Sequence, residues 1–283
     1  MSDEIIGGYR LMKHMVTGQT SQVWEVVETA SHRHFAMKML LPEKAHDPEH
    51  RRLLFHEAEV GKSLAHPNVI KIVAFSKDAH NPYIVMEFFP AGNLKLRLLR
   101  KDAQFLREKM HDIVKQAATA LAFMNAKGWV HRDVKPDNFL VNAAGELRLI
   151  DFALAKRIEK DSFFGRLFRK RGKTAGTRSY MSPEQIRGEP LDGRADVYSF
   201  GATCYELVTG RPPFRGASSQ ELLTKHITEK PVAPQSINRD VTDEFGALVL
   251  RMLAKKKQER PRGFHDVLMD LRNIRVFKAE AAA

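Results

Sequence analysis

The chain has 283 residues, of which 43% are hydrophobic and 28% are charged, and its formal net charge is +12. This length allows one large domain or two smaller lobes, and the composition is globular rather than disordered. The single cysteine, Cys204, excludes an intrachain disulfide, and no apolar run approaches the ~18 residues of a membrane helix. The acidic N-terminus lacks a signal-peptide core, so we expect a cytoplasmic protein.

The first third of the chain is rich in strands. Residues 9–40 contain alternating branched and aromatic residues, which predicts strands separated by turns near residues 17–18 and 31–32. Three more elements are expected next: a helix over 50–65 that ends before His66-Pro67, and strands over 69–76 and 83–88.

From about Leu94 onward the apolar residues follow a helical period. Helices are expected over 108–127, 194–209, 219–228, 242–254 and 264–276. Strands followed by helices predict an α+β fold with two lobes, joined near the turn at Pro90–Asn93. A cleft between two lobes is a favoured place for a ligand.

The loop at residues 131–138 reads His-Arg-Asp-Val-Lys-Pro-Asp-Asn, and Asp151-Phe152 follows thirteen positions after Asn138. Phosphoryl transfer from a metal-bound nucleotide needs one carboxylate to orient a hydroxyl, and an amide and a second carboxylate to hold Mg²⁺. The two segments resemble the catalytic and metal-binding loops of eukaryotic-type (Hanks-type) serine/threonine protein kinases.

The resemblance implies a bilobal kinase domain over 9–276, with tails at 1–8 and 277–283. It places a small antiparallel sheet with one main helix in the N-lobe (9–89) and a mainly helical C-lobe at 93–276. It implies ATP and Mg²⁺ as cofactors, with Mn²⁺ as the alternative metal. The expected reaction transfers the γ-phosphoryl group to serine or threonine hydroxyls of protein substrates, including residues of the protein itself.

Within this resemblance, Asp133 orients the hydroxyl and accepts its proton, while Lys135 neutralises charge on the transferred group. Asn138 and Asp151 hold the metal through oxygen atoms. A lysine two residues after the aspartate resembles the serine/threonine branch of the family.

Lys38 closes the apolar segment Phe35-Ala36-Met37 and resembles the lysine that binds the α- and β-phosphates of ATP. Its expected partner is Glu57, nineteen residues later on the predicted helix, and Glu59 is the competing choice. Taken alone, such a lysine would be an ordinary solvated strand end.

The remaining nucleotide contacts also follow from the resemblance. Met86 is expected to control the pocket behind the adenine, with backbone groups of Glu87 and Phe89 at the adenine edge and Val23, Ala36 and Leu140 against the ring. Val16, Gly18 and Ser21 belong to the loop that covers the phosphates. Without the kinase motifs, the apolar members would be plain core residues.

The segment from Gly176 to Glu184 resembles the one that docks the substrate peptide, with Ser182 in place of the usual alanine. Thr177 is expected to contact Asp133 and Lys135. Two structural roles are also implied: Glu184 pairs with Arg260 in a buried ion pair, and Asp196 anchors the 131–138 loop through its backbone.

The chain departs from the family pattern at three places. The phosphate-covering loop keeps only Gly18 of three glycines, Ala153 replaces a glycine after Asp151-Phe152, and Gly61 replaces a large apolar residue on the predicted helix. We expect the missing glycines of the loop to weaken nucleotide binding. Ala153 is expected to bias the loop between its active and inactive states, and Gly61 to leave the predicted helix loosely coupled.

Residues 156–173 carry eight Lys or Arg and only two acidic residues, a local charge of +6. Thr174 and Ser162 are the candidate phosphorylation sites, whose phosphate Arg132 would receive. Residues 163–173 mix aromatic and basic residues, which suits an acidic partner, an anionic membrane or an inhibitory helix. A mobile loop with apolar residues resting on the C-lobe fits equally well, and the pattern does not favour nucleic acid.

Two alternatives to catalysis remain open. A kinase-fold scaffold with weak or no catalysis would explain the degenerate glycine loop and Ala153. A basic adaptor would use residues 156–173 to bind a membrane or nucleic acid. Lys38, Glu57, Asp133, Asn138 and Asp151 are all present, which favours the enzyme.

Overall fold

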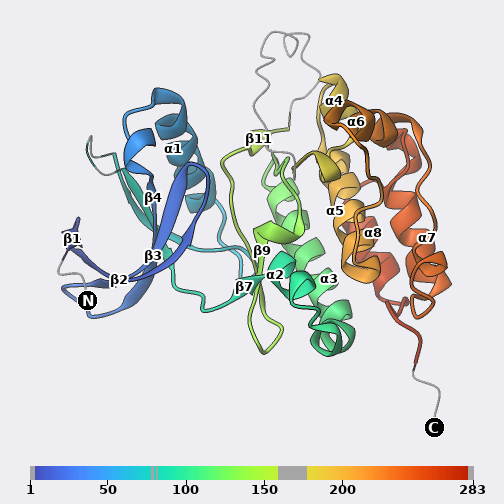
Figure 1. The fold of residues 1–283 in the computed structure, drawn as a ribbon, viewed down its shortest axis with the longest axis horizontal. Helices are drawn as coiled ribbons and strands as arrows, with labels where there is room; N and C mark the ends of the chain where they lie inside the picture. Colours follow the sequence, from blue (N-terminus) through green and yellow to red (C-terminus); the bar gives the residue numbers. More distant parts are fainter. Residues whose placement is uncertain (1–3, 78–79, 81, 159–176, 280–283) are drawn as a thin grey trace. The chain divides into compact units, whose positions relative to one another are not determined.

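The computed structural model describes residues 4–77, 80, 82–158 and 177–279, which form two compact units (Figure 1). The N-terminal unit contains the residues up to Ala91 together with Ile150–Leu154. The C-terminal unit contains Gly92–Leu149 and the residues from Ala155 on. The predicted α+β class is confirmed, because the first unit is built on a sheet and the second is mainly helical.

A six-stranded antiparallel sheet forms the N-terminal unit, in the order β1-β2-β3-β4-β6-β5. Its strands are β1 (Ile5–Ile6), β2 (Tyr9–Thr17), β3 (Ser21–Glu28), β4 (His34–Leu40), β5 (Ile72–Ser76) and β6 (Tyr83–Glu87). On one face Tyr9 packs edge-on against Phe35 and Tyr83. The strand predicted from residue 69 begins only at Ile72, because His66–Val69 forms a turn closed by the bond from Val69 N to His66 O.

Helix α1 (Pro48–Lys62) is the main helix of this unit and packs against β4, β5 and β6 (Figure 1). It begins two residues earlier than predicted, because the Asp47 carboxylate caps it by accepting from Glu49 N and His50 N. Pro48 suits the first helical position, where a missing N–H costs nothing.

The helices of the C-terminal unit are α2 (Leu94–Leu99), α3 (Ala103–Ala126), α4 (Pro183–Arg187), α5 (Gly193–Thr209), α6 (Ser219–Thr228), α7 (Asp243–Met252) and α8 (Phe264–Leu271). Helix α5 is buried on nearly all sides and packs against α3 and α7, so it is the central helix of the core. Cys204 lies inside α5, and burial raises the pKa of its thiol, which makes it an inert packing residue.

Two features of this unit differ from the prediction. Short strands form a sheet of β7 (Gly92–Asn93), β9 (Phe139–Val141) and β10 (Leu147–Leu149), and a pair of β8 (Trp129–Val130) and β11 (Lys156–Arg157). Two or three residues are too few to show a period, so the sequence did not reveal them. The helix predicted over 264–276 is wrong beyond Leu271, because Val276 accepts a bond from Thr242 N and Phe277 pairs with Val241 in extended form.

No helix within the described ranges is both long enough and apolar enough to cross a bilayer.

Candidate active site

Lys38 lies on β4 of the N-terminal unit, where it pairs in register with Val23 and Ile84. Its Nζ lies 2.6 Å from Glu57 Oε2 on α1 and 3.9 Å from Asp151 Oδ1. Glu59 instead lies 3.8 Å from Lys77, with an exposed side chain. The ion pair on Lys38 is therefore made by Glu57 rather than Glu59, nineteen residues away as the spacing predicted.

Burial and charge shift the protonation of this cluster. Burial lowers the pKa of the Lys38 ammonium, but the facing carboxylates of Glu57 and Asp151 outweigh it and raise the pKa above its ordinary value. Burial also raises the pKa of Glu57 to about 7, although Lys38 opposes the shift. Lys38 therefore stays charged, while Glu57 titrates close to neutral pH.

We expect any phosphoryl transfer that depends on the Lys38–Glu57 ion pair to have an acid limb near pH 7. The raised pKa means that Glu57 is neutral below about 7 and gives up its ion pair with Lys38. The same shift makes the folded protein bind this proton more tightly than the unfolded chain, so the contribution of Glu57 to stability falls as pH rises from 4.5 through 7. The pH profile of kcat/KM for ATP turnover measures the limb.

In Glu57→Gln this limb should disappear, leaving a low activity that no longer changes with pH near 7. Glu59→Gln is the matched control, because it removes an exposed carboxylate from the same helix and should keep the wild-type profile. A limb that persists in Glu57→Gln would assign the titration to another group.

Asp151, Phe152 and Ala153 follow one another in the N-terminal unit. Asp151 has a left-handed backbone (φ 66°), and Phe152 is fully buried. Ala153 does not have a positive φ, and its backbone N–H donates to Asp151 Oδ1 at an N···O distance of 3.4 Å. Alanine at this position therefore causes little backbone strain, because the observed conformation does not require the positive φ that glycine allows.

The space beside Gly61 is filled. A Cβ at this position would lie 2.4 Å from Ile72 Cγ1 and 3.2 Å from Phe152 Cδ2. The expectation of a loosely coupled helix is therefore wrong, because Ile72 of β5 occupies the volume that a large side chain on α1 would fill.

The loop predicted to cover the phosphates is the hairpin turn between β2 and β3, whose pairing has register shifts between Leu11 and Lys13 and between His14 and Val16. Val16 pairs with Val23 in the ladder, and Gly18 N donates to Ser21 O at 2.8 Å. Neither Gly18 nor a neighbouring turn residue has a positive φ. The hairpin therefore closes without the missing glycines, whose loss concerns only how closely the backbone can approach a phosphate.

The apolar residues expected around the adenine have these positions. Ala36 on β4 pairs with Met86 on β6, and both are buried. Val23 is half-buried on β3, Phe89 is buried and accepts from Ala91 N through its carbonyl, and Glu87 N donates to Lys71 O. Leu140 lies on β9 of the C-terminal unit, opposite Arg148.

The 131–138 loop in the C-terminal unit holds two expected catalytic residues and one expected metal ligand within hydrogen-bonding distance of each other. Lys135 Nζ lies 2.6 Å from Asp133 Oδ2. Asn138 Nδ2 donates to Asp133 O at 2.8 Å and to Asp133 Oδ2 at 3.1 Å. Asp133 Oδ1 is buried and has no hydrogen-bond partner in the described part of the chain. This oxygen is a strong acceptor, and a buried acceptor without a partner suits a ligand that donates a hydrogen bond.

Asp196 at the start of α5 supports this loop. Its Oδ2 accepts from His131 N at 2.8 Å and from Asn125 Nδ2 at 3.1 Å, and its Oδ1 accepts from Arg132 N at 2.9 Å. Asp196 is fully buried, and burial raises the pKa of its carboxyl, although the N–H groups of the loop oppose the shift. A buried carboxylate on the central helix thus fixes the backbone just before Asp133.

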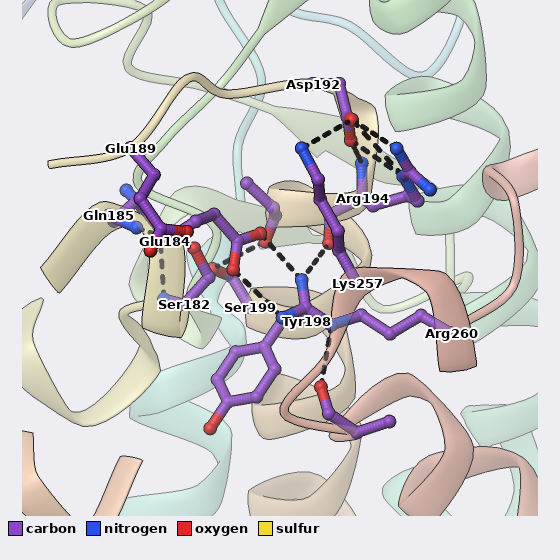
Figure 2. Close-up of polar contacts among 12 residues, drawn as sticks. Ser182, Glu184, Gln185, Glu189, Asp192, Arg194, Tyr198, Ser199, Lys257 and Arg260 are labelled. Atoms are coloured by element: carbon purple, nitrogen blue, oxygen red, sulfur yellow. Dashed lines mark hydrogen bonds and ion pairs between the residues drawn. The ribbon is translucent and has the colours of Figure 1, made fainter. Parts of the chain in front are cut away.

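Glu184 and Arg260 form a buried bidentate ion pair in the C-terminal unit (Figure 2). Arg260 Nη1 lies 2.7 Å from Glu184 Oε1, and Nη2 lies 2.9 Å from Oε2. Arg260 also donates to the carbonyls of Arg194, Ala254 and Lys255. The guanidinium therefore uses all five of its N–H groups in joining three segments.

A model of the protein kinase domain family matches residues 9–270. The chain belongs to this family. A probable serine/threonine-protein kinase of Clostridium acetobutylicum is 31% identical over 94% of this chain and 40% of its own length. Serine/threonine-protein kinase PknB of Mycolicibacterium smegmatis is 33% identical over 96% of this chain and 43% of its own. The chain thus spans about two fifths of the length of the curated relatives it matches.

The oxygen donors of this kinase domain fit a hard divalent cation. Both amide protons of Asn138 in the C-terminal unit point to Asp133, which leaves its carbonyl oxygen for a metal. In the N-terminal unit, the carboxylate of Asp151 is also an oxygen donor of the kind that such a cation prefers. Across the described ranges, no three His, Cys, Asp or Glu side chains gather into a metal cage. Mg²⁺ in kinases needs no such cage, because phosphate oxygens and water complete its coordination.

Ser162, Thr174 and the basic segment 163–173 lie outside the described residues. Thr177 begins the 3₁₀ helix η3 (Thr177–Tyr180), and its expected contact with Asp133 and Lys135 stays a prediction.

Sequence reasoning missed two groups of supporting residues. Buried Glu206 on α5 accepts from Lys95 of α2 at 2.6 Å and from the Tyr180 hydroxyl. Gln185 of α4 donates to Arg132 O at 2.9 Å. No local pattern signals these contacts, since their partners lie 26 to 111 residues apart.

Proposed function

We propose that this kinase domain transfers the γ-phosphoryl group of ATP to serine or threonine hydroxyls of protein substrates, its own included. The observation that carries the proposal is the state of Asp133. One of its carboxylate oxygens is bound by Lys135 and Asn138, and the other is buried and unbonded. That oxygen can accept a hydrogen bond from a hydroxyl and orient it for attack. The serine/threonine-protein kinases among the relatives support the choice of hydroxyl.

The other residues have supporting roles in this proposal. Lys38, held by Glu57, would bind the phosphates of ATP, and Lys135 would offset the charge that builds on the transferred group. Asn138 and Asp151 would hold Mg²⁺, which neutralises phosphate charge when bound. We infer a cytoplasmic location, where ATP is available. We also infer that the kinase domain extends to residue 276, because Val276 is buried.

A kinase-fold scaffold without catalysis is the second candidate. Of the departures from the family pattern that favour it, Ala153 loses weight because its backbone does not have a positive φ. Gly61 also loses weight, because Ile72 and Phe152 fill the space beside it. The degenerate phosphate loop is its remaining support.

Mg²⁺-dependent incorporation of labelled phosphate into a generic protein substrate tests the proposal. We expect turnover in the wild type and a loss of roughly 10²-fold or more in Lys38→Met, which removes the phosphate-binding charge. No incorporation by wild type, with Mg²⁺ or Mn²⁺, would favour the scaffold.

A further inference from the structure

Gln185 lies at the start of α4, where its side chain serves two segments at once. Its Oε1 accepts from Ser182 N at 3.1 Å, while Ser182 Oγ accepts from Gln185 N at 3.3 Å, which completes a capping box (Figure 2). Its Nε2 donates to the carbonyl of Arg132 at 2.9 Å, fifty-three residues away in the 131–138 loop. One half-buried amide therefore joins the helix cap to that loop.

Arg132 needs such support because its backbone is strained. It has φ 69°, in the left-handed region that residues with a Cβ rarely occupy. Asp196 holds its N–H at 2.9 Å, and Gln185 holds its carbonyl. Both polar groups of its backbone are thus fixed by side chains from α4 and α5, directly before Asp133.

The peptide bond between Arg132 and Asp133 is planar, so fixing the Arg132 carbonyl also fixes the start of Asp133. We propose that Gln185 is a positioning residue for phosphoryl transfer, which holds the Arg132 carbonyl and thereby aims the Asp133 carboxylate. This inference rests on the proposed kinase function. It adds a role for a side chain outside the catalytic loop.

The chemistry requires an amide at this position. The carbonyl oxygen of glutamine accepts from Ser182 N, and its NH₂ group donates to Arg132 O. A glutamate can accept in the capping box but has no proton for the Arg132 carbonyl. A methionine of similar length can do neither.

These differences separate the loop contact from the helix cap. Gln185→Glu should keep the helix cap but lose about tenfold in kcat, with the KM for ATP unchanged and only the small fall in Tm that one lost hydrogen bond causes. Gln185→Met should show the same loss of kcat and, in addition, a Tm lower by about 2 °C for the lost cap. Thr242→Ala is the matched control, because it removes the cap of remote α7 and should lower Tm without changing kcat.

Amide hydrogen exchange supplies a readout that does not depend on activity. Both Gln185 variants should speed exchange at residues 132–135, while Thr242→Ala should not. Unchanged exchange there would overturn the proposal, and so would a kcat loss confined to Gln185→Met, since the cap alone would explain it. A wild type without turnover would contradict the kinase function, and the exchange data would then decide the loop contact by themselves.

Discussion

Asp133→Asn is expected to lower kcat by roughly 10²- to 10⁴-fold, the range for loss of a general base. The asparagine keeps the size of the side chain and still accepts from Lys135 and Asn138 through one oxygen. Its second position becomes an NH₂ group, which cannot accept a proton from the substrate hydroxyl where Asp133 Oδ1 now can. Steady-state phosphorylation of a protein substrate measures the change.

Asp137→Asn is the matched control, because it removes the same charge from a half-buried position in the same loop. We expect its kcat to stay within about threefold of the wild type, since loss of a nearby charge alone has a small effect. Equal losses in both variants would mean that the charge of the loop matters, rather than the free oxygen of Asp133.

Arg260→Met is expected to lower the free energy of unfolding by about 3–5 kcal/mol, the usual cost of leaving a buried charge without its partner. The methionine fills a similar volume but leaves the Glu184 carboxylate buried and unpaired. It also leaves the carbonyls of Arg194, Ala254 and Lys255 without their donor. Urea unfolding followed by circular dichroism gives the difference.

The neighbouring pair of Arg262 and Asp266 supplies the control. Arg262 is 89% exposed, and its ion pair lies in water, so Arg262→Met should leave the urea midpoint unchanged. The double variant Arg260→Met with Glu184→Leu should recover part of the lost stability, because it removes both buried charges. Equal effects of Arg260→Met and Arg262→Met would contradict a structural role for the buried pair.

These experiments distinguish residues proposed to act in the chemical step from residues that stabilise the fold. The Asp133 variant tests the proposed chemical step, whereas the Arg260 and Glu184 variants test the stability of the fold. Gln185 links the two groups, because it lies next to Glu184 on α4 and donates a hydrogen bond to the backbone carbonyl of Arg132 in the 131–138 loop.

Much of the fold was predictable because its signals are local. Alternation along residues 9–40 gave β2 to β4, and helical spacing gave α5, α6 and α7 to within two residues at each end. It also gave α3, which begins at Ala103, five residues before its predicted start. The errors in the predicted secondary structure occur where an element is too short to show a hydrophobic period, or where tertiary contacts end it. The strands of two or three residues have no period, and α8 stops at Leu271 because the following chain pairs with residues 241–242.

The candidate site divides in the same way. The order of chemical groups in residues 131–138 and at 151, and the spacing of Lys38 and Glu57, are properties of the chain itself. These residues resemble the motifs of protein kinases, so the resemblance alone was enough to predict them as the site. The structure adds the local contacts of Lys38 with Glu57 and of Asp133 with Lys135 and Asn138.

Only the tertiary structure decided how well those groups are held. The packing of Ile72 and Phe152 showed that Gly61 leaves no void, and the backbone angles showed that Ala153 needs no glycine. The buried supports at Asp196, Glu206 and Gln185 draw on partners far apart in the chain. The strength of these contacts comes from burial and from hydrogen-bond geometry, which arise only when distant segments pack. Residue types and local hydrophobic periods, in contrast, are already fixed by the amino-acid sequence.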